Sequence, residues 1–371
     1  MISIRFLTKN LFSILLTISL VLLLVFAQPI AASVSRGLSI CLNTLIPSLF
    51  VFMIIADFTV RTGVIDWISR PFGILCAKLF HIDASFGTLL VMSLICGYPV
   101  GAKLLADQVA SGKLSKDEAS RMLAFCVNAG PAFIIGSVSV PIFGSAKFGF
   151  FLFLSHLIAF FVVGIVSGIK KKVFSVNISQ QKTGYANGLV DAVGSSCKAM
   201  LNICAFVLLF SGVIGLLELT GVIPALASLF NPSIPQELTQ AGLYGMLEVS
   251  NGILLCKGLP SAFLLAAAIT AFGGLCVQFQ IQSIVGKRNI SMKYFYLYRP
   301  LYIFVSVLTA WIFSHLYHPA MQTMIVNSST IPQTTSSTPL ASLFLIVLSA
   351  SLLLCDKKSG TILDNQKIKR R

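Results

Sequence analysis

Apolar residues run in long stretches along most of this chain, separated by short polar segments. Eight stretches are near the ~20 residues that a helix needs to cross the hydrocarbon core of a bilayer. They cover residues 11–32, 38–60, 118–140, 146–169, 196–223, 262–283, 296–317 and 338–355. A helix satisfies its own backbone groups in lipid. The pattern therefore predicts an all-α polytopic membrane protein with about eight transmembrane helices.

Two further apolar stretches, about 84–109 and 240–261, are interrupted near their middle. The first is broken by the run Gly97 to Gly101, and the second by the run Ser250 to Gly252. Non-helical backbone at membrane depth is tolerated where it lines a cavity or is buried in protein. We therefore interpret both stretches as re-entrant hairpins that return to the side from which they enter.

Basic residues support this arrangement. If the N-terminus is cytoplasmic, the outer loops 33–37, 141–147, 224–239 and 318–337 hold only two basic residues, Arg36 and Lys147. Most other Lys and Arg fall in the inner loops 61–83, 110–121, 170–195 and 284–299 or in the tail 356–371. Counting either hairpin as a full span would put basic loops on both sides, against the positive-inside rule. We expect a bacterial inner-membrane protein with both termini cytoplasmic.

The two halves of the chain have a similar order of elements. Thr62-Gly63-Val64-Ile65 ends one apolar helix, and Thr220-Gly221-Val222-Ile223 ends another. In each half a hairpin, a helix interrupted by small residues and a further span follow. The first half begins outside and the second inside, which predicts an inverted repeat of the kind common in transporters.

The predicted organisation has six parts. They are an N-terminal transmembrane helix at 1–34, a first repeat at 35–170, a cytoplasmic linker at 171–195, a second repeat at 196–317, an outer polar loop at 318–337, and a last transmembrane helix with a basic cytoplasmic tail at 338–371. The N-terminal segment also resembles a signal peptide, so its cleavage is an open alternative.

Composition narrows the class of protein further. Only 11% of the 371 residues are charged, against about 25% in soluble domains. The net charge of +15 does not indicate nucleic-acid binding, because the basic residues lie between apolar runs. The nine cysteines include no CxxC pair and are read as packing residues. Without a phosphate-binding loop, a metal cluster or a nucleophile motif, we expect neither enzyme activity nor a cofactor.

We expect a substrate site between the two hairpin tips and the two interrupted helices, where helix ends meet near the bilayer midplane. The candidate binding residues are Gly97, Tyr98, Pro99, Gly101, Lys103, Asn128, Gly130, Pro131, Glu248, Ser250, Asn251, Gly252, Lys257 and Gln278.

Among these residues the ionisable ones have alternative roles. Lys103 and Lys257 are expected to bind an anion. Glu248 could couple protons or sodium or bind substrate, or it could form a salt bridge with either lysine. The amides of Asn128 and Gln278 could bind substrate or join helices.

Two further polar residues in apolar segments have a simpler interpretation. Asp57 lies near the inner end of its helix and is expected either to snorkel or to pair with Arg61, four residues on. His156 lies within an apolar span and is favoured as a hydrogen-bonding packing residue over a proton relay.

Three short runs resemble a known family. The run Ser93 to Leu104, with its Gly-Tyr-Pro-Val-Gly-Ala-Lys string, resembles a signature of the sporulation integral membrane protein YlbJ family, and the runs 128–133 and 247–252 do so too. The resemblance covers about residues 35–317. That family is grouped with nucleoside-recognition, or Gate, domain proteins, which are related to concentrative nucleoside transporters.

The resemblance implies transport of a small polar solute across the lipid bilayer, with anionic dipicolinic acid during endospore formation as the suggested substrate. The alternatives are a nucleoside-type transporter and a non-transporting scaffold for spore-envelope assembly. The oligomeric state is left open.

Overall fold

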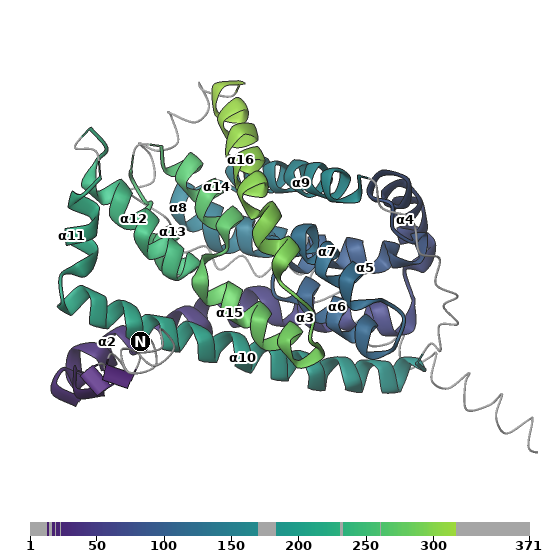
Figure 1. The fold of residues 1–371 in the computed structure, drawn as a ribbon, viewed down its shortest axis with the longest axis horizontal. Coiled ribbons are helices and arrows are strands. Elements are labelled where there is room, and N and C mark those ends of the chain that lie inside the picture. The colour runs from purple at the N-terminus through teal and green to yellow at the C-terminus, as the bar shows by residue number, and fades with distance from the viewer. Residues whose placement is uncertain are drawn as a thin grey trace, which may run out of the picture.

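The computed structural model describes residues 24–169, 183–230, 233–259 and 261–316, with a few residues between 13 and 22, and every element within these ranges is helical. The first half contains α2 (Ala27–Ile40), η1 (Cys41–Leu45), α3 (Ile46–Thr62), α4 (Asp66–Phe80), η2 (Ala84–Phe86), α5 (Gly87–Cys96), α6 (Val100–Ala110), α7 (Lys116–Cys126), η3 (Ala132–Ser139), α8 (Val140–Phe143) and α9 (Ala146–Gly168). The second half contains α10 (Tyr185–Leu219), α11 (Val222–Ser228), α12 (Gln236–Leu247), α13 (Val249–Leu255), α14 (Ala262–Phe272), α15 (Gly274–Val285), η4 (Gly286–Arg288) and α16 (Lys293–Leu316) (Figure 1).

Helices suited to a membrane make up much of the described part. Five stretches are long and apolar enough to span a bilayer, namely Ala27–Thr62, Ala146–Gly168, Tyr185–Leu219, Ala262–Arg288 and Lys293–Leu316. Large apolar side chains point outward from them, with Leu201 66% and Phe304 62% exposed. Lipid is the solvent that stabilises such a surface. The predicted all-α membrane fold is confirmed, whereas the predicted span 338–355 and the segments 318–337 and 356–371 lie outside the described residues.

Two long antiparallel helices run along one side of the molecule. The stretch α2–η1–α3 has 36 residues and α10 has 35, so each is about 50 Å long at 1.5 Å per residue. Gly215 lies against Ser33, Gly37 against Ser211, and Gly188 against Thr62. Small residues at these crossings let the two backbones approach closely, as in other membrane helix pairs. Figure 1 shows α10 along the lower edge with α2 beside it.

This pair changes two predicted boundaries. The predicted outer loop 33–37 is helical, so the boundary at residue 34 falls within a continuous helix. The segment contains no proline, and Arg36 forms an ion pair with Glu218 of α10 at 2.8 Å, which favours the helix continuing. At the other end, residues 185–195 of the predicted linker already belong to α10.

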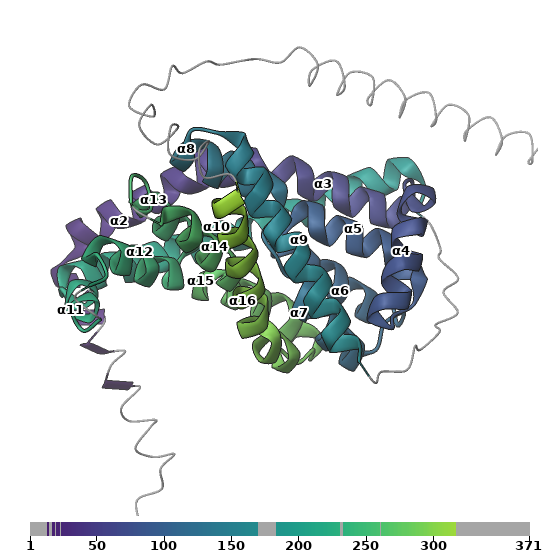
Figure 2. The same cartoon turned by 90° about the horizontal axis from the view of Figure 1, so that it is seen from above.

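The two halves present their elements in the same order. α3 ends at Gly63 and α10 ends before Gly221, and both glycines have φ of 65°, a left-handed conformation that favours glycine. A connecting helix follows each, α4 or α11, and then a hairpin, an interrupted helix and a long final helix, α9 or α16. The two final helices pack together, with the Phe151 and Phe313 rings 5.5 Å apart. Figure 2 shows α9 and α16 side by side.

Each apolar stretch that was predicted to be interrupted folds as two short helices. α5 has 10 residues and α6 has 11, or about 15–17 Å each, which is half of the ~30 Å hydrocarbon thickness. In the second pair, α12 has 12 residues and α13 has 7, and the two meet at Glu248. The predicted break at Ser250 to Gly252 is wrong, because these residues form the first turns of α13, which Glu248 caps. These lengths agree with hairpins that turn back near mid-membrane.

The helix that follows each hairpin is also broken, at the predicted positions. α7 ends at Cys126, and residues 127–130 are non-helical before η3. α14 ends at Gly273, which has φ of 83°, and Gly274 follows with φ of 62°. Both breaks leave carbonyl groups at the ends of α7 and α14 without a helical partner.

Candidate functional site

The tip of the first hairpin rests on the break after α7. Tyr98 N–H donates to the Asn128 carbonyl at 2.6 Å. A side chain at Gly97 would overlap the backbone of Gly130, and one at Gly130 would meet the Ile95 carbonyl. The Tyr98–Pro99 peptide bond is cis. The glycines predicted at this site therefore permit two irregular backbone segments to touch.

Gly101, on the second leg of this hairpin, also permits two backbone segments to touch. A side chain there would overlap the Cys126 carbonyl at the end of α7. Pro131 begins η3 on the far side of the break. These two residues therefore shape the backbone around the site.

The tip of the second hairpin is organised by Glu248. Its carboxylate accepts hydrogen bonds from the backbone N–H groups of Ser250 at 3.0 Å and Asn251 at 2.8 Å, and from Asn251 Nδ2 at 2.9 Å. Glu248 is therefore the N-cap of α13 and satisfies its first donors. No ion pair joins it to a lysine among the described residues, and its hydrogen bonds explain its burial instead.

The second hairpin also contacts its own broken helix. A side chain at Gly274 would lie 3.1 Å from the Gly245 carbonyl and 3.3 Å from Val249 N. A side chain at Gly252 would overlap the backbone of Gly245, so the two legs touch there. Each half thus pairs a hairpin tip with a helix break.

The two tips face each other across a small central cavity of about 30 Å³, room for about one water molecule. Its lining includes Tyr98, Pro99, Gly130, Glu248, Ser250 and Gln280, with apolar side chains from α3 and α10. Five of the predicted site residues therefore meet at one cavity between the hairpins.

Two larger cavities lie on either side of the central one along α3. The Asn43 cavity, about 370 Å³, is lined by residues that include Asn43, Thr44, Ser48, Gly136 and Leu254. It shares the side chains of Phe133 and Ser250 with the central cavity. The Asp57 cavity, about 420 Å³, is lined by residues that include Asp57, Arg61, Asp107, Lys113 and Thr183.

Packed side chains separate the Asp57 cavity from the central cavity. On α3, Met53 is 3% and Ala56 is 0% exposed, and they lie between Leu49 of the central cavity and Asp57. On α6, Lys103 lies one turn beyond Pro99 of the hairpin tip. Any solute passing between the two cavities must displace these groups.

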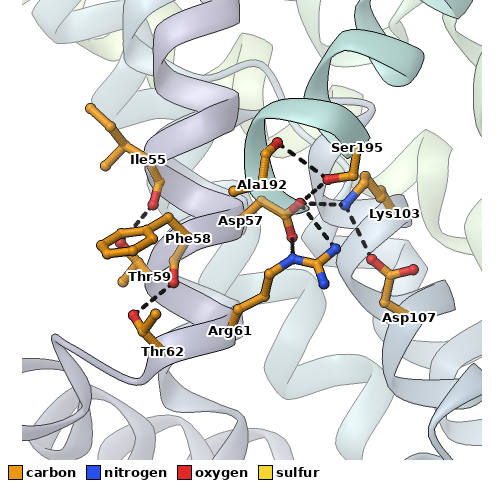
Figure 3. A network of polar contacts seen from close by, with 10 residues as sticks. All are labelled: Ile55, Asp57, Phe58, Thr59, Arg61, Thr62, Lys103, Asp107, Ala192 and Ser195. Carbon is orange, nitrogen blue, oxygen red and sulfur yellow. Dashed lines mark hydrogen bonds and ion pairs between the residues drawn. The ribbon is translucent and has the colours of Figure 1, made fainter. Parts of the chain in front are cut away.

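Asp57 is the centre of an ion cluster at this boundary (Figure 3). Its carboxylate pairs with Lys103 Nζ at 3.1 Å and with Arg61 Nε at 3.1 Å, and it accepts a hydrogen bond from Ser195 Oγ. Lys103 also pairs with Asp107 at 3.2 Å. The Asp57 cluster therefore joins α3, α6 and α10, and the predicted Asp57–Arg61 pair is confirmed.

The two predicted anion-binding lysines do not come together. Lys103 belongs to the Asp57 cluster, whereas Lys257 is exposed beyond the end of α13 and lines none of the three cavities. Both lysines follow a hairpin tip, and the predicted inverted repeat would carry them in opposite directions.

The remaining polar candidates are buried near the breaks. Asn128 is 1% exposed and donates from Nδ2 to the Phe125 carbonyl at 3.1 Å, but its Oδ1 has no partner among the described residues. Gln278 is buried on α15 but outside the central cavity. His156 contacts Tyr302 Oη at 3.3 Å and Thr270 Oγ1 at 3.0 Å, which agrees with its interpretation as a packing residue.

Arg299 is a prominent residue that the sequence reasoning missed. It is 4% exposed on α16, and it donates to the Val127 carbonyl at 2.9 Å and the Phe272 carbonyl at 3.3 Å. These carbonyls lie at the ends of α7 and α14, so one side chain bridges the two helix breaks. Arg299 lies within the predicted span 296–317, where an ionisable residue is a functional candidate by default, but it also ends the basic loop 284–299 and was counted with that loop.

Together the membrane-length helices, the paired breaks and the cavities between them define an integral membrane protein with a polar site in its interior. The chain is similar to the sporulation integral membrane protein YlbJ of Bacillus subtilis (strain 168), with 26% identity in a match that covers 78% of this chain and 83% of the relative. This similarity supports a place for the chain in the YlbJ family, as the sequence motifs predicted. No family model and no solved structure was found to match.

Proposed function

We propose that this chain transports a small polar solute across the membrane through the site between the two hairpin tips. The observation that carries the proposal is the row of three cavities along α3, with the smallest in the middle. A transporter needs a site that closes on both sides. A scaffold has no need for broken backbone around a buried cavity that Glu248 and Ser250 help to line.

The predicted topology fits this function. The loops expected in the cytoplasm supply Asp66, Ser111, Lys113 and Thr183 to the Asp57 cavity. The Asn43 cavity includes Pro141, at the start of a loop expected outside. In the proposal, the two larger cavities are therefore the inner and outer approaches to the site.

The suggested substrate is a small aromatic dicarboxylate, and dipicolinic acid is the first compound to test. The relative is named a sporulation protein, and endospore formation is the setting that the family resemblance implies. A nucleoside is the second candidate, from the same resemblance.

Reconstitution tests the proposal directly. The purified chain in proteoliposomes is offered labelled dipicolinate and labelled uridine in parallel, with protein-free vesicles as the control. We expect saturable uptake of dipicolinate above the control. Uptake of uridine alone would support transport but would make a nucleoside, and not dipicolinate, the substrate. Absence of flux for both, in protein that remains folded in the vesicles, would reject these substrates and favour a scaffold.

A further inference from the structure

Arg299 combines burial with an incomplete set of partners. Its Nε and Nη1 donate to the Phe272 and Val127 carbonyls, whereas Nη2 has no hydrogen-bond acceptor among the described residues. The rings of Phe295 and Tyr302 lie 4.5 and 5.1 Å from its guanidinium carbon. Aromatic faces attract a cation, but they do not accept all of its N–H groups.

No carboxylate neutralises this charge. Within the described ranges, the ion pairs involve Arg36, Arg61, Lys103 and Arg121, and none involves Arg299. Arg121 is a useful comparison, because it is also buried and also binds two backbone carbonyls, but it has Glu118 as a counter-ion. A buried charge without a counter-ion is costly. A bound anion that is not part of this chain would supply the missing counter-ion.

A second polar atom at the same helix break lacks a partner. Asn128 Oδ1 belongs to the residue after Val127, whose carbonyl binds Arg299. Buried polar atoms are nearly always paired in folded proteins, and exceptions call for an explanation. Arg299 Nη2 can bind an acceptor such as a carboxylate oxygen, whereas Asn128 Oδ1 requires a donor from another part of a solute.

Tyr98 lies between Arg299 and the central cavity. Its ring lines that cavity, and its hydroxyl donates to the Thr270 carbonyl at 3.5 Å, near the limit for a hydrogen bond. A Cβ at Gly273 would lie 3.3 Å from Arg299 Nη2 and 3.9 Å from the Tyr98 ring. The Tyr98 ring and the Arg299 guanidinium therefore both lie beside Gly273, and the same ring lines the central cavity.

We infer that Arg299 binds the carboxylate of an anionic solute, and that the Tyr98 ring closes this anion site from the central cavity. The planar guanidinium suits a carboxylate better than a lysine ammonium does. Lys103 is already paired with two carboxylates and Lys257 lies outside the cavities. The inference rests on the proposed transport function and names the charge and chemical class of its solute.

Binding measurements test the inference apart from flux. The full chain in lipid nanodiscs is titrated with dipicolinate and with its neutral diamide, pyridine-2,6-dicarboxamide. We expect the wild type to prefer the dicarboxylate. Arg299→Gln should weaken dicarboxylate binding by roughly ten- to a hundredfold, the loss typical of a charged hydrogen bond, and leave diamide binding unchanged.

Arg121→Gln is the matched control. It removes a buried arginine with similar carbonyl contacts and should lower thermal stability without changing the preference between the two compounds. Should Arg299→Gln fail to fold, Arg299→Lys carries the test. The ammonium keeps the charge without the bridging geometry, so the dicarboxylate preference should persist at reduced affinity.

The outcomes are separable. An unchanged preference in folded Arg299→Gln, equal loss of both ligands in Arg299→Lys, or no preference in the wild type overturns the anion site, even where the chain transports another solute. Dicarboxylate binding that depends on Arg299, without flux in proteoliposomes, upholds the anion site and rejects transport.

Discussion

Asp57 on α3 and Lys103 on α6 form an ion pair of 3.1 Å at the boundary between the Asp57 cavity and the central cavity. Asp57 is 4% exposed, so the pair is largely shielded from water, and removing one partner would leave the other charge poorly compensated. In the proposed transporter, this contact holds the inner approach shut.

Weakening this pair should open the inner approach. Cys96 lines the central cavity and is buried, so it can report access if every other cysteine is replaced. We expect Asp57→Asn and Lys103→Gln each to raise the rate at which a membrane-impermeant maleimide labels Cys96 from the inner side by about tenfold, because either change removes one partner of a shielded pair. The exposed Lys198 of α10 supplies the control, Lys198→Gln, which should label like the wild type. Equal rates in all variants would exclude the cluster as a closure.

The contact between the legs of the second hairpin can be tested with a single methyl group. Gly252→Ala would place a Cβ against the backbone of Gly245, which cannot rotate away. Overpacking of this kind costs about 1–3 kcal/mol, and we expect a lower melting temperature and reduced uptake. Gly242→Ala, on the same hairpin, meets only Leu265 at 3.7 Å and should be neutral or slightly stabilising. A Gly252→Ala protein as stable as Gly242→Ala would contradict the close packing described here.

The capping role of Glu248 and the role of its charge can be tested with two different substitutions. Glu248→Ala removes the acceptor for two backbone N–H groups and should cost about 0.5–2 kcal/mol, the usual effect of losing an N-cap. Glu248→Gln keeps one acceptor oxygen and should lose less stability. Thermal unfolding in detergent gives both values. If the two variants are equally stable, the cap is not what holds this hairpin tip.

The two hairpins are expected to open toward opposite sides of the membrane. Ser111 and Thr183 both line the Asp57 cavity, whereas Lys257 follows the second hairpin and lines none of the cavities. Single cysteines at 111 and 183 should therefore react from one side of the membrane and a cysteine at 257 from the other. Impermeant reagents applied to intact cells and to inverted vesicles check this. Labelling of positions 111 and 183 from different sides would refute the hairpin topology.

The class of fold and the positions of the breaks could be predicted because they depend on local sequence. Glycine and proline at Gly97, Pro99, Gly130 and Gly273 interrupt apolar runs, and three of the four breaks include or adjoin one of them. The fourth break, at the tip of the second hairpin, falls at Glu248 and not at the predicted run 250–252, because the Glu248 side chain caps the helix that contains this run. The continuous helix through residues 33–37 could not be predicted, because it depends on contacts with α10, far away in sequence. In the sequence Arg36 and Gly37 indicate a loop. In the structure they contact Glu218 and Ser211 of α10, and the helix continues through them.

Part of the site could also be predicted, because hairpin tips are recognisable from local sequence. Tyr98, Glu248 and Ser250 meet at the central cavity, as expected for residues at hairpin tips. The partners of the charged residues were not predictable. A sequence does not show that Lys103 contacts Asp57 or that Lys257 lies outside all three cavities. Arg299 acquires its importance only from two carbonyl groups on other helices.

The bridge formed by Arg299 also limits how such a protein can move. Val127 belongs to the first half and Phe272 to the second, so one guanidinium fastens the two halves together at their centre. Arg299 itself lies on α16 of the second half, so a rocking motion that separates the halves would have to break its bond to Val127 in every cycle. Motion confined to the hairpin tips would leave both bonds intact. In the proposed transporter, the bridge therefore favours a stationary frame around α16 with the two hairpin tips as small mobile arms, and a solute would cross by passing from one arm to the other.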